Sequence, residues 1–315
     1  MRTYQDEPVM LRETLAKTMI EYAGKDSRIV ALDADLASSS GFGAFQKAFP
    51  DRFFNCGVAE ANMVGIAAGL SSTGRIPFAH SFGTFASRRV CDQIFLSGAY
   101  SGAHMVIVGS DPGVTAAYNG GTHMPFEDMG VLRSIPGIKL IEVTDSTMLR
   151  GIFDEIISSP AVYYLRLKRK VTTAVYGEDE KFKIGKANVL REGKDAAVIC
   201  SGIMVAESLK AADILESEGI KVTVIDMHTW KPIDEDIVAK YAKETGVIIT
   251  AENHNVVGGL GAAVCEAVCK LSPCRVIRHG IQDEFGEVGT ESYLKTRFKL
   301  NAADVAETVR NAIKL

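Results

Sequence analysis

Residues 53–70 read FFNCGVAEANMVGIAAGL, and the order of residue types in this stretch indicates the fold. Its second part, residues 59–70, is rich in alanine and glycine, which predicts a helix packed closely against its neighbours. On either side, residues 28–34 (RIVALDA) and 76–80 (IPFAH) predict short strands. Several predicted strands are continuously apolar, as expected when helices cover both faces of a sheet.

The alternation of helix and strand continues along the 315 residues. It is interrupted at residues 170–186 by a charged stretch without a clear period, KVTTAVYGEDEKFKIGK. We therefore predict an α/β chain of two tandem three-layer α/β domains, at residues 1–170 and 187–315, joined by a linker at residues 171–186. Other predicted elements are helices at residues 10–24, 84–97 and 146–157, and strands at residues 105–109, 139–143, 162–167, 196–200, 222–225, 246–251 and 275–279.

The composition argues against several classes of function. Hydrophobic residues make up 47% of the chain and charged residues 23%, and 39 acidic against 35 basic side chains give no excess of positive charge for nucleic acid. No apolar run approaches the roughly 18 residues of a membrane span, and we see no secretory signal pattern. Six scattered cysteines predict reduced thiols. We expect a cytoplasmic protein that binds neither nucleic acid nor membrane.

Four predicted loops follow the carboxyl ends of strands, where open α/β sheets bind ligands. The longest of them is polar, bears glycines and contains His123. Glu60 lies beside the alanine-rich helix, where partial desolvation favours its protonated form. Taken alone, Glu60 is also explained as an acid that complements a helix dipole, and His123 as an ordinary loop residue. The four loops are at residues 33–40, 55–60, 81–85 and 110–128.

Six segments share more than an α/β pattern. In order along the chain they are FFNCGVAEANMVGIAAGL, PFAHSFGTF, GGTHMPFEDMGVLRSIPGIKL, YYLRLKR, IDMHTWKPID and TAENHNVVGGLGAAV. In this order and spacing they resemble the transketolase family over nearly the whole chain. The resemblance implies a thiamine-diphosphate pyrimidine-binding domain followed by the transketolase C-terminal domain.

The resemblance also makes one absence informative. Members of this group hold Mg²⁺ and the cofactor's diphosphate with a Gly-Asp-Gly motif followed roughly 25–30 residues later by Asn, which are oxygen ligands that suit this ion. No Gly-Asp-Gly occurs in the sequence. The resemblance therefore implies the carboxy-terminal subunit of a split transketolase that uses thiamine diphosphate. The Mg²⁺ ligands would lie on a separate amino-terminal subunit, and this chain would supply none. The two kinds of chain would form a dimer of heterodimers.

Individual site residues follow from the same resemblance. Glu60 matches the glutamate that hydrogen-bonds the aminopyrimidine ring and shares a proton with it. Phe82 and Phe85 match the aromatic residues that flank this ring, and Leu36 matches an apolar contact to it. His123, in the motif THMP, matches a histidine that faces the reacting centre and would stabilise charge developing on the donor. The other histidines are predicted to be structural: His80, His104, His228, His254 and His279.

Other matched positions concern the sugar substrate. Ser39 and Arg169 match positions that contact the substrate phosphate, although Arg169 is alternatively part of a solvated basic strand end. Many transketolases have a phosphate-contacting histidine where this chain has Ser110, and an aspartate that contacts sugar hydroxyls where it has Asn119. We therefore predict transfer of a two-carbon ketol unit to an aldose from a ketose that is phosphorylated or otherwise anionic. His123 would also contact this donor.

Other functions remain open at this point. The beta-type subunit of a thiamine-dependent 2-oxoacid dehydrogenase combines the same two domains. The segment at residues 120–137, GGTHMPFEDMGVLRSIPG, is more similar to transketolase or to deoxyxylulose-phosphate synthase than to that subunit. An enzyme like deoxyxylulose-phosphate synthase is therefore an alternative as well. A non-catalytic assembly subunit is a further alternative, since a fold does not determine a function. Retention of Glu60, Phe82, Phe85 and His123 argues against it.

Overall fold

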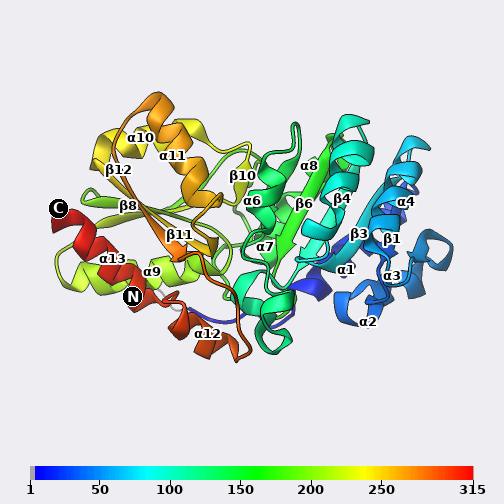
Figure 1. Cartoon of the computed structure of the whole chain (residues 1–315), viewed down its shortest axis with the longest axis horizontal. Coiled ribbons are helices and arrows are strands. Elements are labelled where there is room, and N and C mark those ends of the chain that lie inside the picture. The colour runs from blue at the N-terminus through cyan, green and yellow to red at the C-terminus, as the bar shows by residue number, and fades with distance from the viewer. Residues whose placement is uncertain (1–3, 315) are drawn as a thin grey trace.

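The computed structural model describes residues 4–314 and shows two α/β units side by side (Figure 1). The first sheet has the strand order β10-β5-β6-β4-β3-β1-β2 and the second β12-β11-β8-β9-β7. The strands of the first sheet are β1 (Ile29–Asp33), β2 (Phe53–Asn55), β3 (Ile76–Phe82), β4 (Met105–Ser110), β5 (Lys139–Glu142), β6 (Val162–Leu167) and β10 (Thr229–Lys231). Those of the second are β7 (Asn188–Arg191), β8 (Ala196–Cys200), β9 (Val222–Asp226), β11 (Val247–Asn255) and β12 (Arg275–Ile281).

Helices cover both faces of the first sheet, as predicted for apolar parallel strands. In β1, Ile29 and Ala31 belong to one hydrophobic core, and Val30 and Leu32 belong to another on the opposite face. The α-helices of the first unit are α1 (Leu11–Lys25), α2 (Ala37–Ser40), α3 (Phe42–Ala48), α4 (Glu60–Ser72), α5 (Cys91–Gln93), α6 (Asp128–Arg133), α7 (Ser146–Gly151) and α8 (Phe153–Ser158). Those of the second are α9 (Ile203–Ser217), α10 (Glu235–Thr245), α11 (Leu260–Leu271), α12 (Glu291–Arg297) and α13 (Ala302–Lys314). The prediction of two tandem α/β domains is confirmed.

One predicted helix, at residues 84–97, is only partly right. After β3 the chain makes turns, and helical structure begins at the 3₁₀ turn η2 (Arg88–Val90), continuing through α5 into the π-helix η3 (Ile94–Tyr100). The Ser87 hydroxyl donates a hydrogen bond of 2.6 Å to the Gly83 carbonyl, and this side-chain bond holds the preceding residues in turns. The remaining short helices of the first unit are η1 (Pro50–Arg52), η4 (Gly113–Asn119) and η5 (Gly121–His123).

The two units share parts of the chain. Strand β10 comes from the second half of the sequence, yet it pairs antiparallel with β5 at the edge of the first sheet. Conversely, residues near the amino terminus lie along the second unit before the chain enters α1 in the first unit (Figure 1). There the Tyr4 hydroxyl donates to Asp213 Oδ2 of α9 at 2.7 Å. The predicted boundaries at residues 170 and 187 stay a prediction, and each unit includes a segment from beyond them.

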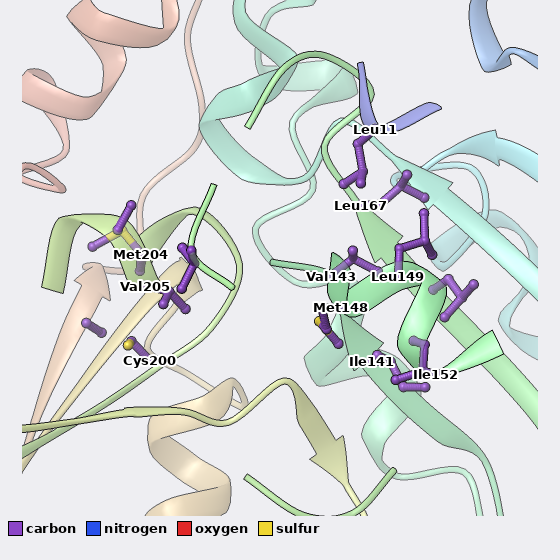
Figure 2. Close-up of a cluster of buried hydrophobic side chains, with 14 of the residues drawn as sticks. Leu11, Ile141, Val143, Met148, Leu149, Ile152, Leu167, Cys200, Met204 and Val205 are labelled. Atoms are coloured by element: carbon purple, nitrogen blue, oxygen red, sulfur yellow. The ribbon is translucent and has the colours of Figure 1, made fainter. Parts of the chain in front are cut away.

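The larger hydrophobic core extends from one unit into the other. Figure 2 shows members of it from both sides, with Ile141, Val143 and Met148 in the first unit and Cys200 and Met204 in the second. All five side chains are buried. Burial of this apolar surface stabilises the association of the two units.

A fully buried arginine lies where the two units meet. Arg166 of β6 forms ion pairs with Asp128 Oδ2, at 2.9 Å from its Nε, and with Glu142. Its Nη2 donates to the Asn253 carbonyl of β11 at 2.9 Å and to the Pro125 carbonyl at 3.2 Å. Burial by itself lowers the pKa of Arg166, but the two carboxylates outweigh it and keep the pKa above its ordinary value.

A buried acid lies at the same interface. The carboxylate of Asp226, at the end of β9, accepts hydrogen bonds from the Thr144 hydroxyl at 2.6 Å and the Tyr176 hydroxyl at 2.7 Å. Burial raises the pKa of Asp226 to about 7 in spite of these two donors.

This acid makes the stability of the chain depend on pH. The pKa of Asp226 is higher in the folded chain than in the unfolded one, so its stabilising contribution is full below about pH 4 and is lost as the pH rises through about 7. We expect Asp226→Asn to remove up to about 4 kcal/mol of this pH-dependent change. Urea unfolding of both proteins at pH 5 and pH 8 measures it, with the exposed Asp236→Asn as control. An unchanged pH dependence in Asp226→Asn would contradict the prediction.

None of the helices within residues 4–314 is long and apolar enough to cross a membrane. The six cysteines are free in the structure. Only Cys200 is buried, and Cys269 is exposed.

Candidate active site

Glu60 begins helix α4, and its carboxylate is buried with two donors. Ser81 Oγ of β3 donates to Oε1 at 3.0 Å, and Arg89 Nη1 donates to Oε2 at 2.7 Å. The Arg89 guanidinium also lies over the ring of Phe85, 4.0 Å from its centroid. The side chain of Glu60 is 3% exposed and that of Arg89 is 45% exposed, so the arginine forms the outer layer over the acid.

Arg89 changes the electrostatic setting that the sequence suggested for Glu60. The sequence suggested a desolvated acid without a cation, whereas in the structure an arginine donates a hydrogen bond to the carboxylate. The structure therefore places beside Glu60 a partner that the sequence reasoning missed. Two adjacent arginines at positions 88 and 89 are visible in the sequence, but nothing in their spacing indicates that one of them contacts residue 60.

His123 lies against both predicted aromatic residues. Its ring makes edge contacts with Phe82 and Phe85, with centroids 5.8 Å and 5.1 Å apart. The Thr122 hydroxyl and His123 Nδ1 are 2.9 Å apart, which leaves Nε2 as the other polar atom of the ring. Since Phe85 also contacts Arg89, the structure brings the catalytic candidate His123 into one cluster with the surroundings of Glu60.

Ser110 belongs to a buried row of polar side chains at the ends of three strands. Its hydroxyl lies 3.0 Å from His80 Nε2, and His80 Nδ1 lies 3.3 Å from Asp33 Oδ2. Asp33 also accepts hydrogen bonds from the Leu36 backbone N–H and from Ser40 Oγ. His80 was predicted to be structural, and it links the start of the long loop to the loop that follows β1.

Arg12 contacts both Ser39, in the short helix α2, and the backbone of Arg169. Arg12 Nη1, from α1, donates to the Ser39 carbonyl at 2.9 Å, and its backbone N–H donates to the Arg169 carbonyl at 3.3 Å. Arg169 forms an ion pair with the buried Asp111 at 2.8 Å and lies 5.3 Å from the centroid of Phe82. Arg12 was missed by the sequence reasoning, because a charged residue near the start of an amphipathic helix carries no signal of a site.

The structure brings some of the predicted residues into direct contact and leaves others apart. Glu60, Phe82, Phe85, His123 and Arg169 are linked through direct ring or ionic contacts, either with one another or through Arg89. Leu36 precedes the short helix α2, Ser39 lies within it, and Ser110 is the last residue of β4. Asn119 is exposed and makes no side-chain hydrogen bond within residues 4–314. In the same described part of the chain, no three His, Cys, Asp or Glu side chains are grouped as a metal site needs.

The structure thus gathers a buried glutamate, an aromatic pair and a histidine near the carboxyl ends of parallel strands. The description "Transketolase, pyrimidine binding domain" belongs to the family model that matches residues 7–173, and "Transketolase, C-terminal domain" to the one that matches residues 185–305. The chain belongs to the transketolase family, whose members depend on thiamine diphosphate.

Similar proteins include subunits of divided transketolases. The chain is 49% identical over 295 residues to the 6-deoxy-6-sulfo-D-fructose transketolase subunit SqwH of Clostridium sp. strain MSTE9, covering 94% of this chain and 92% of that protein. It is 34% identical over 308 residues to one of the subunits of the apulose-4-phosphate transketolase of Phocaeicola vulgatus, covering 97% and 98%. A solved "split gene transketolase, inactive beta4 tetramer" has a TM-score of 0.91 and 38% identity, covering 98% and 99%.

These likenesses confirm the class of enzyme that the motifs predicted. The chain is a carboxy-terminal subunit of a split transketolase, a transferase that works on ketol groups with a partner subunit. The 2-oxoacid dehydrogenase subunit and the assembly-only subunit are less favoured.

Proposed function

We propose that this chain supplies the pyrimidine-binding half of the active site of a split transketolase whose donor is a ketose with a terminal anionic group. The observation that carries the proposal is the set formed by Glu60, Phe85 and His123, over which the half-exposed side chain of Arg89 forms the outer layer. A buried carboxylate beside aromatic ring faces suits a planar, hydrogen-bonding heterocycle.

The residues around Glu60 fit an aminopyrimidine ring. The guanidinium of Arg89 is planar, donates N–H to this carboxylate and lies over the ring of Phe85. An aminopyrimidine ring is also flat and carries N–H donors, so it could make the same two contacts. The Arg89 side chain is 45% exposed and would turn toward solvent when the ring takes its place. Thiamine diphosphate, when bound, supplies a carbon nucleophile and an electron sink. On this chain Glu60 would hold a proton against the ring, and Phe82, Phe85 and Leu36 would fix the ring's plane.

His123 would act on the substrate rather than on the cofactor. Its edge contacts with both aromatic rings support this role, because Phe85 also contacts the arginine that covers Glu60. Its Nε2 would hydrogen-bond an oxygen of the donor ketose and stabilise the negative charge that develops on that oxygen. Ser110 and Asn119 would contact other hydroxyl groups of the sugar.

An exposed apolar strip supports the proposed partner. Val58, Ile66, Phe95, Leu96 and Tyr100 expose apolar surface on or beside α4 and η3, two neighbouring helices of the first unit. Large exposed apolar patches mark interaction surfaces. Since Glu60 begins α4, a chain bound here would close the site. We assign this surface to an amino-terminal subunit that carries Gly-Asp-Gly and the Mg²⁺ ligands, in a dimer of heterodimers.

The anionic end of the donor would be bound by Arg12, Ser39 and Arg169. Arg12 contacts the Ser39 carbonyl through its guanidinium and the Arg169 carbonyl through its backbone, which supports this assignment, and guanidinium groups suit a sulfonate or phosphate. The 49% identity to a subunit named for 6-deoxy-6-sulfo-D-fructose favours a sulfonated ketose. A two-carbon ketol unit from it would pass to an aldose. Such a reaction suits a cytoplasmic enzyme, and free cysteines are typical of that compartment.

The role of Arg169 gives a prediction about selectivity. We expect Arg169→Gln to lower kcat/KM for the sulfonated ketose about 10- to 100-fold, because a charge-assisted hydrogen bond is worth about 1.5–3 kcal/mol. The loss for a neutral ketose should be smaller, because it reports only the unpairing of the buried Asp111. Steady-state kinetics of the assembled enzyme measure both donors. The exposed Lys170→Gln is the control for general loss of positive charge, and equal losses on both donors would refute the assignment.

Reconstitution tests the function as a whole. The chain is mixed with the candidate amino-terminal subunit, thiamine diphosphate and Mg²⁺, and ketol transfer is measured with a sulfonated ketose, xylulose 5-phosphate, a neutral ketose and a 2-oxoacid. We expect activity only from the mixture, greatest with the sulfonated ketose. Full preference for xylulose 5-phosphate would overturn the sulfonated donor, and preference for the neutral ketose would overturn the anionic substrate class. Decarboxylation of the 2-oxoacid without ketol transfer would overturn the reaction.

A further inference from the structure

The long loop at residues 110–126 has an unusual backbone. Asp111 and Ala117 have positive φ angles of 58° and 49°, and Gly113 has a φ of 49°. Non-glycine residues in such conformations cost of order 1–3 kcal/mol each, and they persist when surrounding structure imposes them. The loop carries His123, so its shape decides where this side chain lies. Its own sequence does not favour that shape.

Support for the start of the loop comes from the second unit. Asn253 of β11 is fully buried, and its side-chain amide bonds the loop backbone twice. Its Oδ1 accepts from the Val114 N–H at 3.0 Å, and its Nδ2 donates to the Pro112 carbonyl at 2.9 Å. Gly113 lies between these two residues, and a Cβ there would overlap the side chain of Asn253. The Asn253 amide can therefore approach the loop backbone only because residue 113 is a glycine.

The far end of the loop is held by the same strand. The Asn255 N–H donates to the Phe126 carbonyl at 2.7 Å. Arg166 donates to the carbonyls of both Asn253 and Pro125, and the Gly113 N–H donates to Pro125 at 3.2 Å. The end of β11 thus joins the two ends of the loop, and His123 lies on the segment between them.

We propose that Asn253 is a positioning residue for ketol transfer: from the second unit, it sets the shape of the loop that presents His123. The catalytic part of this statement rests on the proposed function. An amide is suited to the task because it offers one acceptor and one donor in a fixed plane, which match the Val114 N–H and the Pro112 carbonyl. The C-terminal domain thereby acts on a reaction whose groups lie on the other domain.

Asn253→Asp perturbs this contact with little change of volume. The carboxylate still accepts from Val114, but its second oxygen faces the Pro112 carbonyl, which has no proton to give. The matched control is Asn188→Asp in the same unit, where Nδ2 also donates to a backbone carbonyl, that of Lys181 at 3.2 Å. This second asparagine is on β7, at the opposite edge of the second sheet.

The first measurement uses the isolated chain and is independent of activity. Hydrogen–deuterium exchange, read by mass spectrometry, should be at least about tenfold faster over residues 112–126 in Asn253→Asp, since a lost hydrogen bond of about 1.4 kcal/mol changes opening tenfold. Exchange in Asn188→Asp should match the wild type there. Exchange that is unchanged in Asn253→Asp would overturn the proposal. Should this variant not fold, Asn253→Ala removes both bonds without adding a charge.

The second measurement uses the enzyme assembled with its partner. We expect Asn253→Asp to lower kcat about 10- to 100-fold for sulfonated and neutral ketoses alike, because a small displacement of a reacting group has effects of this size. Its Kd for thiamine diphosphate should stay within about twofold of wild type, since Glu60 and Phe85 are not on the loop. A loss of cofactor affinity as large as the loss of kcat would indicate general damage and overturn the proposal. Wild-type enzyme without ketol transfer would instead refute the proposed function, while the exchange result would stand.

Discussion

Glu60→Gln is expected to lower ketol transfer by the assembled enzyme at least about a hundredfold. Positioned acid–base groups contribute about 10²–10⁴-fold to rates, and glutamine cannot share a proton with a bound ring. The substitution keeps the size of the side chain and an oxygen that accepts from the Ser81 hydroxyl. We therefore expect kcat to fall while the variant still folds and associates with its partner. Steady-state kinetics and size-exclusion chromatography of the mixture measure these properties.

A surface pair provides the control for Glu60→Gln. Glu218 accepts hydrogen bonds from Arg310 at 2.7 Å through both carboxylate oxygens, far from the candidate site. Glu218→Gln therefore also removes a charge that is paired with an arginine, and it should leave kcat unchanged. If Glu60→Gln kept wild-type activity in the same assay, the assignment of Glu60 would be wrong.

Arg166→Leu is expected to lower the free energy of unfolding by about 3–5 kcal/mol. The substitution leaves Asp128 and Glu142 buried without their shared cation, and uncompensated buried charges are strongly unfavourable. It also removes donors to the carbonyls of Asn253 and Pro125. Chemical denaturation of the isolated chain at pH 7 measures the loss.

The comparison for Arg166 is another arginine with a carboxylate partner. Arg310→Leu breaks the exposed pair with Glu218, and exposed ion pairs contribute only about 0–1 kcal/mol. A loss in Arg166→Leu no larger than in Arg310→Leu would mean that the buried network contributes little to stability.

Much of the fold was predictable because it depends on local patterns. Continuous apolar runs such as residues 105–109 predicted strands covered on both faces, and β4 (Met105–Ser110) matches that run within one residue. The helix expected at residues 84–97 was partly wrong because Ser87 bonds back to Gly83 and delays its start. The pairing of β10 with β5 could not be predicted, since three residues carry too little pattern to identify a partner strand.

The candidate site also contains residues that the sequence could predict and residues that it could not. Glu60 and His123 could be predicted because each lies within a continuous stretch of sequence that matches the family. Arg89, Arg12 and Asn253 were not identified, because each meets the site through contacts with residues distant in sequence. Arg89 is 29 positions from Glu60, and Asn253 is 139 positions from Val114. Such contacts depend on how helices and sheets pack, which a single sequence does not specify.

The crossing of β10 into the first sheet has a consequence for how this chain could be divided. A protease that cuts within residues 171–186 would not release two independent halves, because Thr229–Lys231 would be removed from the edge of the first sheet only by unfolding part of the second unit. The first half made alone would expose the open edge of β5, a template for aggregation. A gene break at this point would therefore be tolerated only if both pieces were synthesised together and folded as one body.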